Sequence, residues 1–186
     1  MNRPTLAAAA VLMLVSACSS GVGGLPPVAS ASDTTYRLDA GDEVRISVYG
    51  FDQMANTYVV ADSGNISLPM LSLVPASGKT PAELEATIAG MLRERNLAPN
   101  ANVSAQVTKY RPFYILGEVQ KPGQYPYVPG MTLTTAVAIA GGYTFRANTK
   151  QAALTRRQGN AETHGQASRD TTVLPGDTIE VPEAWF

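Results

Sequence analysis

The amino-acid sequence predicts an α+β fold of two small domains, each a small mixed sheet with one helix. Runs of alternating apolar and polar residues, typical of strands with one buried face, are separated by turn residues. A helix start is indicated at Thr80, where a threonine N-cap, Pro81 and Glu83 supply the elements of a capping box. A second helix follows Thr132, and its apolar stripe consists of Leu133, Ala136, Val137 and Ala140.

The first domain is expected at residues 33–109. After a turn at Gly41 and Asp42, alternating apolar residues at 44–48 predict a strand with one buried face. The segment Asp62-Ser63-Gly64-Asn65 predicts a hairpin that joins strands at 58–60 and 66–69. The helix after Thr80 and a final strand supply further apolar positions, which are Leu84, Ile88, Met91, Leu92, Val103, Ala105 and Val107.

The second domain is expected at residues 110–186. It begins with a strand at 113–116 and returns with a strand at 125–128. Pro122 and Gly123 suit the two corners of a type II turn between these strands, which requires a positive φ at Gly123. Gly141 and Gly142 are expected to end the helix, because glycine adopts the left-handed conformation at little cost.

The remainder of this domain is expected to contain a strand at 152–156 and a polar loop at 158–169. A closing strand follows Pro175-Gly176-Asp177, which resembles the earlier segment Ala40-Gly41-Asp42. In both segments the glycine permits the corner, the aspartate caps the turn backbone, and alternating apolar residues begin a strand. We therefore expect the two turns to have the same geometry.

The N-terminal residues 1–17 have the pattern of an export signal. Arg3 precedes ten apolar residues, a run too short to cross a bilayer as a helix. Small residues then precede Cys18, the only cysteine, in a pattern that resembles a lipoprotein signal. We predict that Cys18 is lipidated and that residues 18–32, which contain no charged residue, are a tether outside the core. An ordinary secretory signal with an incidental cysteine is the alternative.

The composition argues against nucleic-acid binding. Removal of residues 1–17 takes away one arginine and leaves 13 basic residues against 15 acidic residues, without a basic cluster. No later segment is apolar and long enough to cross a membrane as a helix. The short, helix-interrupted strands also differ from those of a transmembrane barrel.

We expect no enzyme activity, metal site or cofactor. His164 is the only histidine and has no cysteine to complete a metal site, so it is interpreted as a surface residue. Asp39, Asp42 and Glu43 suit turn capping and solvated charge, with a glycosidase carboxylate pair as the alternative. Five tyrosines are interpreted as strand-packing or subunit-contact residues, with stacking on sugar rings as the alternative role. They are Tyr110, Tyr114, Tyr125, Tyr127 and Tyr143.

Motifs in both domains carry a resemblance to one known family. The pattern F-Y-x-x-G-E-V-x-x-P-G-x-Y from Phe113, followed by T-L-x-x-A-V-x-x-A-G-G, resembles the soluble-ligand-binding β-grasp module of bacterial polysaccharide export outer-membrane lipoproteins. The pattern Y-x-L-x-x-G-D-x-V-x-I from Tyr36 and D-x-G-x-I-x-L-P from Asp62 resemble the family's polysaccharide-export domain. The resemblance covers nearly all of residues 33–186.

This resemblance implies export of capsular or exopolysaccharide by a homo-oligomeric ring, anchored by lipid in the outer membrane and facing the periplasm. The implied partners are an inner-membrane polysaccharide copolymerase and the polysaccharide chain. Longer family members have a C-terminal membrane-crossing helix, whereas this chain stops at Phe186, so a separate outer-membrane pore is a further expected partner. Trp185 and Phe186 are interpreted either as an interface contact or as buried residues. The alternatives are a periplasmic saccharide-binding or scaffolding lipoprotein that forms no conduit and, third, an enzyme that acts on polysaccharide.

Overall fold

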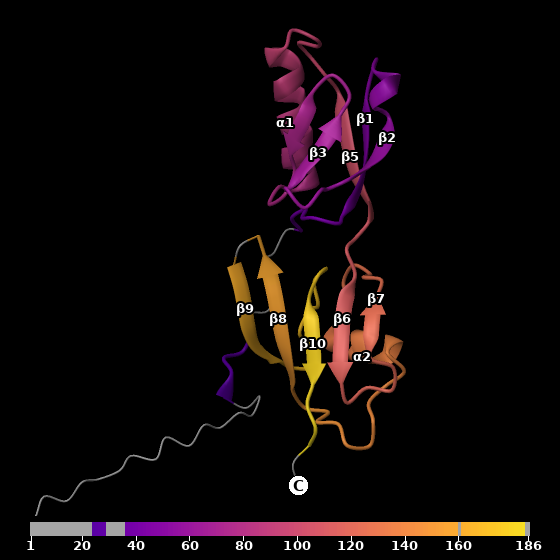
Figure 1. The fold of residues 1–186 in the computed structure, drawn as a ribbon, viewed down its shortest axis with the longest axis vertical. Helices are drawn as coiled ribbons and strands as arrows, with labels where there is room; N and C mark the ends of the chain where they lie inside the picture. Colours follow the sequence, from indigo (N-terminus) through magenta and orange to yellow (C-terminus); the bar gives the residue numbers. More distant parts are fainter. Residues whose placement is uncertain (1–23, 29–35, 160, 185–186) are drawn as a thin grey trace, which may run out of the picture.

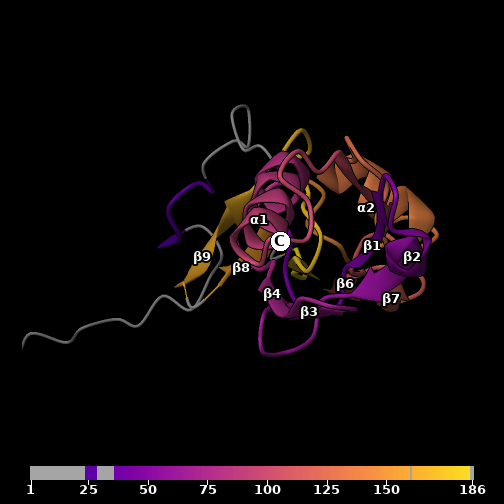
Figure 2. The same ribbon diagram turned by 90° about the horizontal axis from the view of Figure 1, so that it is seen from above.

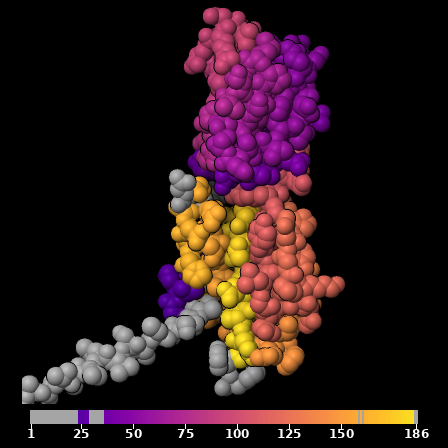
Figure 3. Space-filling model, viewed as in Figure 1, coloured from indigo at the N-terminus to yellow at the C-terminus, as the bar shows by residue number. Residues whose placement is uncertain are grey.

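The computed structural model describes residues 24–28, 36–159 and 161–184, which form two domains stacked along the long axis of the molecule (Figure 1). Figure 3 shows the first domain, residues 36–109, above the second, residues 110–184. Each domain has a hydrophobic core of its own. The predicted α+β fold is confirmed, whereas Cys18, Trp185 and Phe186 lie outside the described residues.

The first domain contains a three-stranded antiparallel sheet of order β2-β1-β5 and a separate two-stranded sheet of β3 and β4. Its elements are β1 (Glu43–Val48), the 3-10 helix η2 (Asp52–Met54), β2 (Asn56–Val59), β3 (Asn65–Leu68), β4 (Ser72–Pro75), α1 (Pro81–Glu94) and β5 (Val103–Lys109). The predicted alternation in β1 is confirmed, because Val44, Ile46 and Val48 are buried.

The hairpin predicted around Asp62–Asn65 is wrong. The turn itself forms, since the Ala61 amide donates to the Asn65 carbonyl at 2.9 Å. However, β2 pairs with β1, and β3 pairs with β4, a strand that sequence analysis missed. Met70 and Ser72 adopt φ angles of 65° and 62°, which turn the chain back on itself directly after β3. The chain therefore finds its partner for β3 in the following residues instead of in the preceding ones.

Helix α1 begins as predicted. The Glu83 amide donates to Thr80 Oγ1 at 3.1 Å, and the Thr80 amide donates to Glu83 Oε2 at 2.9 Å, so the capping box is complete. Leu84, Ile88 and Leu92 form the buried face of the helix. None of the helices in the described part of the chain is long and apolar enough to cross a membrane.

The second domain contains a mixed five-stranded sheet of order β7-β6-β10-β8-β9. The central strand β10 runs parallel to β6 and antiparallel to β8, and α2 packs over the β6–β7 end (Figure 1). The elements are β6 (Phe113–Gly117), β7 (Gly123–Tyr125), α2 (Leu133–Ile139), β8 (Ala152–Gln158), β9 (Ala161–Ala167) and β10 (Thr178–Val181).

The predicted type II turn at Pro122 and Gly123 is wrong. Gly123 is the first residue of β7, without a positive φ, and the return strand ends at Tyr125 instead of Val128. The sharp change of direction occurs at Gly117, with a φ of 85°. A Cβ atom at Gly117 would collide with the Val181 carbonyl oxygen. The Lys121 amide donates to the Ala140 carbonyl at 2.9 Å, so the connection is held against the end of α2 instead of folding tightly.

The polar segment at 158–169, predicted as a loop, instead contains β9. This strand pairs with β8 in continuous register from Ala152↔Ala167 to Gln158↔Ala161. Its first four side chains are exposed, so the segment lacks the apolar alternation from which strands are predicted. His164 is exposed on this strand, as predicted, and its Nδ1 atom lies 2.8 Å from Thr155 Oγ1.

The segment Pro26–Val28 lies beside β9 in Figures 1 and 2, although residues 18–32 were predicted to remain outside the core. The Val28 amide donates to the Gln166 carbonyl at 2.9 Å, and the Gln166 amide donates to the Pro26 carbonyl at 2.8 Å, in the pattern of a parallel bridge. Val28 is 8% exposed and belongs to the second core. A Cβ atom at Gly165 would lie 2.7 Å from the Pro26 carbonyl oxygen, so this glycine permits the close approach.

The helix stop at Gly141 and Gly142 is confirmed. Both residues have positive φ angles, 86° and 93°, and the Gly142 amide donates to the Val137 carbonyl at 2.9 Å. The Thr132 side chain caps the other end, where it accepts from the Thr135 amide, and the predicted stripe of α2 is buried. The sequence thus predicts both ends of this helix correctly.

We expect Gly142→Val to lower the free energy of unfolding by about 1–3 kcal/mol, because a β-branched residue is strained at positive φ. The space around Gly142 is open, so backbone strain is the cause that this variant tests. Gly123→Val is the matched control, since Gly123 is also uncrowded but lacks a positive φ. Urea denaturation measures both variants, and equal stability losses would contradict the assigned cause.

Candidate functional site at the domain junction

The two Gly-Asp turns have the same geometry, as their sequences predict. Gly41 and Gly176 have φ angles of 92° and 83°. Asp42 Oδ2 accepts from the Asp39 amide at 2.8 Å, and Asp177 Oδ2 accepts from the Leu174 amide at 2.7 Å. Each aspartate therefore caps the backbone three residues before it, and both are fully buried.

Arg111 connects the two turns across the junction. Its amide donates to Asp42 Oδ1 at 2.9 Å, and its Nη1 donates to Asp42 Oδ2 at 3.3 Å. From the same side chain, Nε donates to the Pro175 carbonyl at 3.1 Å. A Cβ atom at Gly176 would lie 2.7 Å from Arg111 Nε, so the glycine also makes room for the guanidinium group. The arginine thereby joins the first domain to the second.

Asp177 has an arginine partner of its own. Arg156 Nε donates to Asp177 Oδ1 at 2.9 Å, and its Nη2 donates to Asp177 Oδ2 at 2.7 Å. Nη2 also donates to the Thr172 carbonyl at 2.8 Å. Burial raises the pKa of the Asp177 carboxyl, and the Arg156 guanidinium opposes this effect. The second turn is therefore held by a buried, bidentate ion pair.

Tyrosine side chains complete the junction. The Tyr36 hydroxyl donates to Asp42 Oδ2, and burial, followed by this hydrogen bond, raises the pKa of the Tyr36 hydroxyl. The Tyr36 ring lies edge-to-face with Tyr110 at 4.9 Å between centroids, and Tyr110 lies edge-to-face with Tyr127 at 5.4 Å. The packing interpretation therefore applies to Tyr110 and Tyr127, whereas Tyr114 is half exposed.

Each carboxylate near the start of β1 has a cationic partner within the protein, which fits the predicted structural role. Asp39 Oδ2 lies 3.6 Å from Arg111 Nη1, and Asp39 Oδ1 accepts from Ser77 Oγ at 2.9 Å. Glu43 pairs with Lys109 at 3.0 Å, away from buried Asp42. Within residues 24–28, 36–159 and 161–184, no group of three or more histidine, cysteine, aspartate or glutamate side chains is placed to hold a metal ion.

A polar cleft of about 570 Å³ lies between the domains beside Arg111. Its walls include Asp62 and Ser63 from the turn after β2, and Tyr114, Arg157 and Glu162 from the second sheet. Arg157 Nη2 and Glu162 Oε2 pair at 2.9 Å. The cleft therefore presents hydroxyl groups, charged groups and one half-exposed tyrosine ring, which are groups that can bind a hydroxylated ligand.

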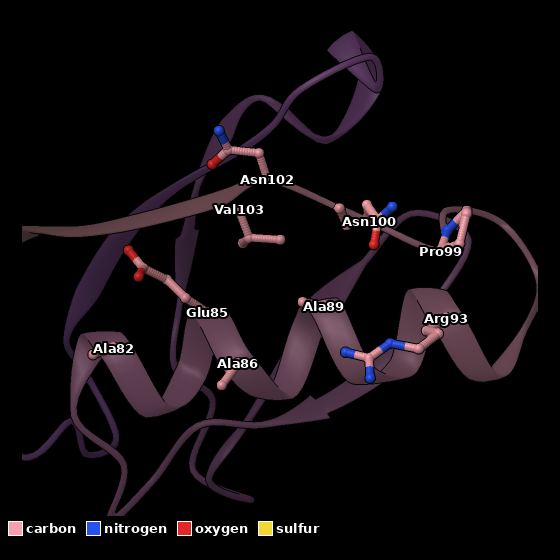
Figure 4. Close-up of a pocket in the computed structure, with 10 residues that line it drawn as sticks. Ala82, Glu85, Ala86, Ala89, Arg93, Pro99, Asn100, Asn102 and Val103 are labelled. Atoms are coloured by element: carbon pink, nitrogen blue, oxygen red, sulfur yellow. The ribbon is translucent and has the colours of Figure 1, made fainter.

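A second, more open groove of about 810 Å³ lies between α1 and the start of β5 (Figure 4). Its helix side is formed by small residues, Ala82, Ala86 and Ala89, with Arg93 at one end. Glu85 Oε1 accepts from the Ala105 amide at 2.7 Å and thus caps one backbone donor on the outer side of β5. The groove brings the helix surface next to the open edge of a sheet.

The fold and the junction define a two-domain α+β protein whose parts are joined by the buried Asp42–Arg111 ion pair. Residues 30–108 match the family model described as polysaccharide biosynthesis/export protein, and residues 112–166 match the SLBB domain. The chain belongs to the bacterial polysaccharide export family, as its motifs predicted.

Three relatives show the extent of the similarity. The exopolysaccharide production protein ExoF of Rhizobium meliloti is 30% identical over 178 residues, which cover 80% of this chain and 42% of ExoF. The polysialic acid transport protein KpsD of Escherichia coli is 29% identical over 109 residues, 58% of this chain and 19% of KpsD. The EPS I polysaccharide export outer membrane protein EpsA of Ralstonia nicotianae is 32% identical over 113 residues, 58% of this chain and 29% of EpsA. The chain spans less than half the length of each relative.

We expect Arg111→Met to lower the free energy of unfolding by about 3 kcal/mol or more, because it leaves the buried Asp42 carboxylate without its cation. Arg157→Met is the matched control, since Arg157 forms an exposed ion pair with Glu162 and its loss should cost less than about 1 kcal/mol. Chemical denaturation measures both variants. Equal losses for the two arginines would show that the junction does not depend on the buried pair.

Proposed function

We propose that the protein exports capsular or exopolysaccharide across the periplasm and outer membrane as a ring-forming, lipid-anchored component of a translocon. The observation that supports this proposal most directly is the match of both domains, in the same chain, to export-family modules. The protein would catalyse no chemical step and would instead form a water-filled passage wide enough for a hydrated polymer. The buried Asp42–Arg111 ion pair suits this task, because it holds the two domains in one orientation.

The proposed location is the outer membrane, with the protein facing the periplasm. Residues 1–17 would be removed as a signal peptide, and Cys18 would carry the lipid. The proposed domain limits are 18–32 for the lipidated segment, 33–109 for the export domain and 110–186 for the β-grasp domain. Proposed partners are further copies of the chain, an inner-membrane polysaccharide copolymerase, the polysaccharide chain and a separate outer-membrane pore.

For the ring, we propose that the groove of α1 and β5 in one subunit receives the β2 side of the next. A closed ring needs a heterologous interface, in which two different faces of the subunit meet. Strands β5 and β2 are the two edges of the first sheet, and Figures 1 and 2 show α1 and β2 on opposite sides of the domain. Val59 on β2 is 57% exposed, and the alanines of α1 permit close approach.

A periplasmic saccharide-binding lipoprotein that forms no conduit is the second candidate. The polar cleft between the domains favours it, because hydroxyl, carboxylate and guanidinium groups beside a tyrosine ring suit a sugar. Monomers that bind oligosaccharide tightly would support this candidate, whereas ring-shaped particles would support the conduit.

We expect Cys18→Ser to block lipidation and to leave the protein unprocessed or mislocalised. The physical reason is that the cysteine thiol is the acceptor for the acyl chains that hold the protein at the membrane. Mass spectrometry of the mature wild-type protein provides the direct test. A mature protein without lipid would rule out the proposed anchor.

We expect Ala86→Arg, in the groove, to abolish ring formation and export while the monomer stays folded. Ala86 is exposed in the monomer, so the arginine acts on the interface instead of on the core. Ala138→Arg, at an exposed position of α2, is the matched control and should leave the rings intact. Electron microscopy in detergent counts the particles, and circular dichroism checks the fold. Rings that survive Ala86→Arg would exclude this interface.

A further inference from the structure

The loop Tyr143–Lys150, named the Phe145 loop here, presents an apolar side chain from a firmly held backbone. The Phe145 side chain is 94% exposed, the largest exposed fraction among the described large hydrophobic residues. On either side of it, Thr144 Oγ1 donates to Glu118, and Arg146 pairs with Glu183. Behind it, Ala147 is buried. An aromatic ring held outward in this way exposes apolar surface that burial would stabilise.

The C-terminal strand segment fixes the same loop. The Ala184 amide donates to the Arg146 carbonyl at 2.7 Å, and the Asn148 amide donates to the Pro182 carbonyl at 2.9 Å. Lys150 is exposed on the loop, and the exposed Arg169 donates through Nε to the Thr149 carbonyl at 3.0 Å. An exposed aromatic ring near cationic side chains is the combination that suits a phospholipid headgroup region.

The docked segment Pro26–Val28 lies at the same end of the second sheet as this loop. Pro27 bridges to Gln166, which pairs with Ala153, the second residue of β8. The Phe145 loop ends only two residues before β8 begins. In Figure 1 this end of the second domain is opposite the first domain.

The length of chain between Cys18 and the docked segment decides which end of the molecule faces the membrane. Pro26 lies eight positions after Cys18, so even a fully extended chain between them would reach about 29 Å at most. To place the first domain against the membrane, the segment would have to pass β9, about 23 Å long, and then the first domain, whose α1 alone is about 21 Å long. That path exceeds the reach, whereas the Phe145 loop lies within it.

We propose that the Phe145 loop is a lipid-contact surface and that Phe145 inserts into the headgroup region of the membrane that holds the anchor. This inference rests on the proposed lipidation of Cys18. It adds a contact that acts with the acyl chains, and it directs the first domain away from the bilayer. The contact does not require the ring, because every residue that forms it belongs to one subunit.

The test uses the full-length lipidated protein in vesicles of phosphatidylethanolamine and phosphatidylglycerol. Phe145→Cys and Tyr49→Cys each introduce a thiol for an environment-sensitive fluorophore, since Cys18 is the only native cysteine and would be occupied by lipid. Tyr49 is the matched control, because it is an aromatic residue that is 87% exposed, on the first domain. We expect spin-labelled lipids to quench the probe at position 145 severalfold more than the probe at position 49. Equal quenching, or stronger quenching at position 49, in protein that floats with the vesicles would overturn the proposal.

A second measurement uses the chain produced without residues 1–18, which lacks both the signal and the anchor, and follows its partition into the same vesicles. Phe145→Ser should then weaken partition by up to about tenfold, because burial of the ring contributes to binding, and Tyr49→Ser should leave it unchanged. Equal partition of the protein with and without Phe145→Ser would also overturn the proposal. Absence of lipid at Cys18 would overturn the proposed anchor, and absence of rings would overturn the proposed conduit. The quenching and partition measurements test the lipid contact of Phe145 separately from both of these results.

Discussion

The arrangement of the two domains depends on how the buried carboxylate of Asp42 is neutralised. A charge removed from water is tolerated only when an opposite charge and hydrogen-bond donors surround it. Asp42 receives these from Tyr36, from the Asp39 amide and from Arg111, which also donates to Pro175 in the second domain. Since one guanidinium serves both domains, the requirement to satisfy a single buried group also fixes their relative orientation. The junction is therefore specified by charge, while each domain keeps a separate apolar core.

The structure could be predicted from the sequence where it is determined by neighbouring residues. The capping box at Thr80, the cap at Thr132, the stop at Gly142 and the two Gly-Asp turns each depend on groups within a few residues of one another. Strand pairing was predicted less well, because it depends on distant partners. Strand β3 pairs with β4 because of left-handed residues at Met70 and Ser72, which are residue types that rarely adopt this conformation.

The residues of the candidate site also differ in how far the sequence alone predicts them. Asp42 and Asp177 were identified from their turns, but Arg111 and Arg156 were not, because Arg111 lies 69 positions from Asp42 and Arg156 is 21 positions from Asp177. The best available signal was the repeated Gly-Asp turn, since two buried carboxylates require two cations. The docking of Val28 also escaped prediction, because its surroundings have the glycine, proline and serine content of a linker.

The position of Val28 in the second core has a consequence for how the chain is connected. Residues 24–28 and 110–184 contribute to one domain, and residues 36–109 form the other, so the first domain is an insertion within the second. The polypeptide therefore passes between the domains twice. Two covalent connections restrict hinge motion more than one would, and they add to the restraint that the Asp42–Arg111 ion pair provides. Val28 is synthesised before the inserted first domain, whereas the other core residues of the second domain are synthesised after it. The second domain therefore cannot complete its core until the first domain has been synthesised, which links the folding of the two domains.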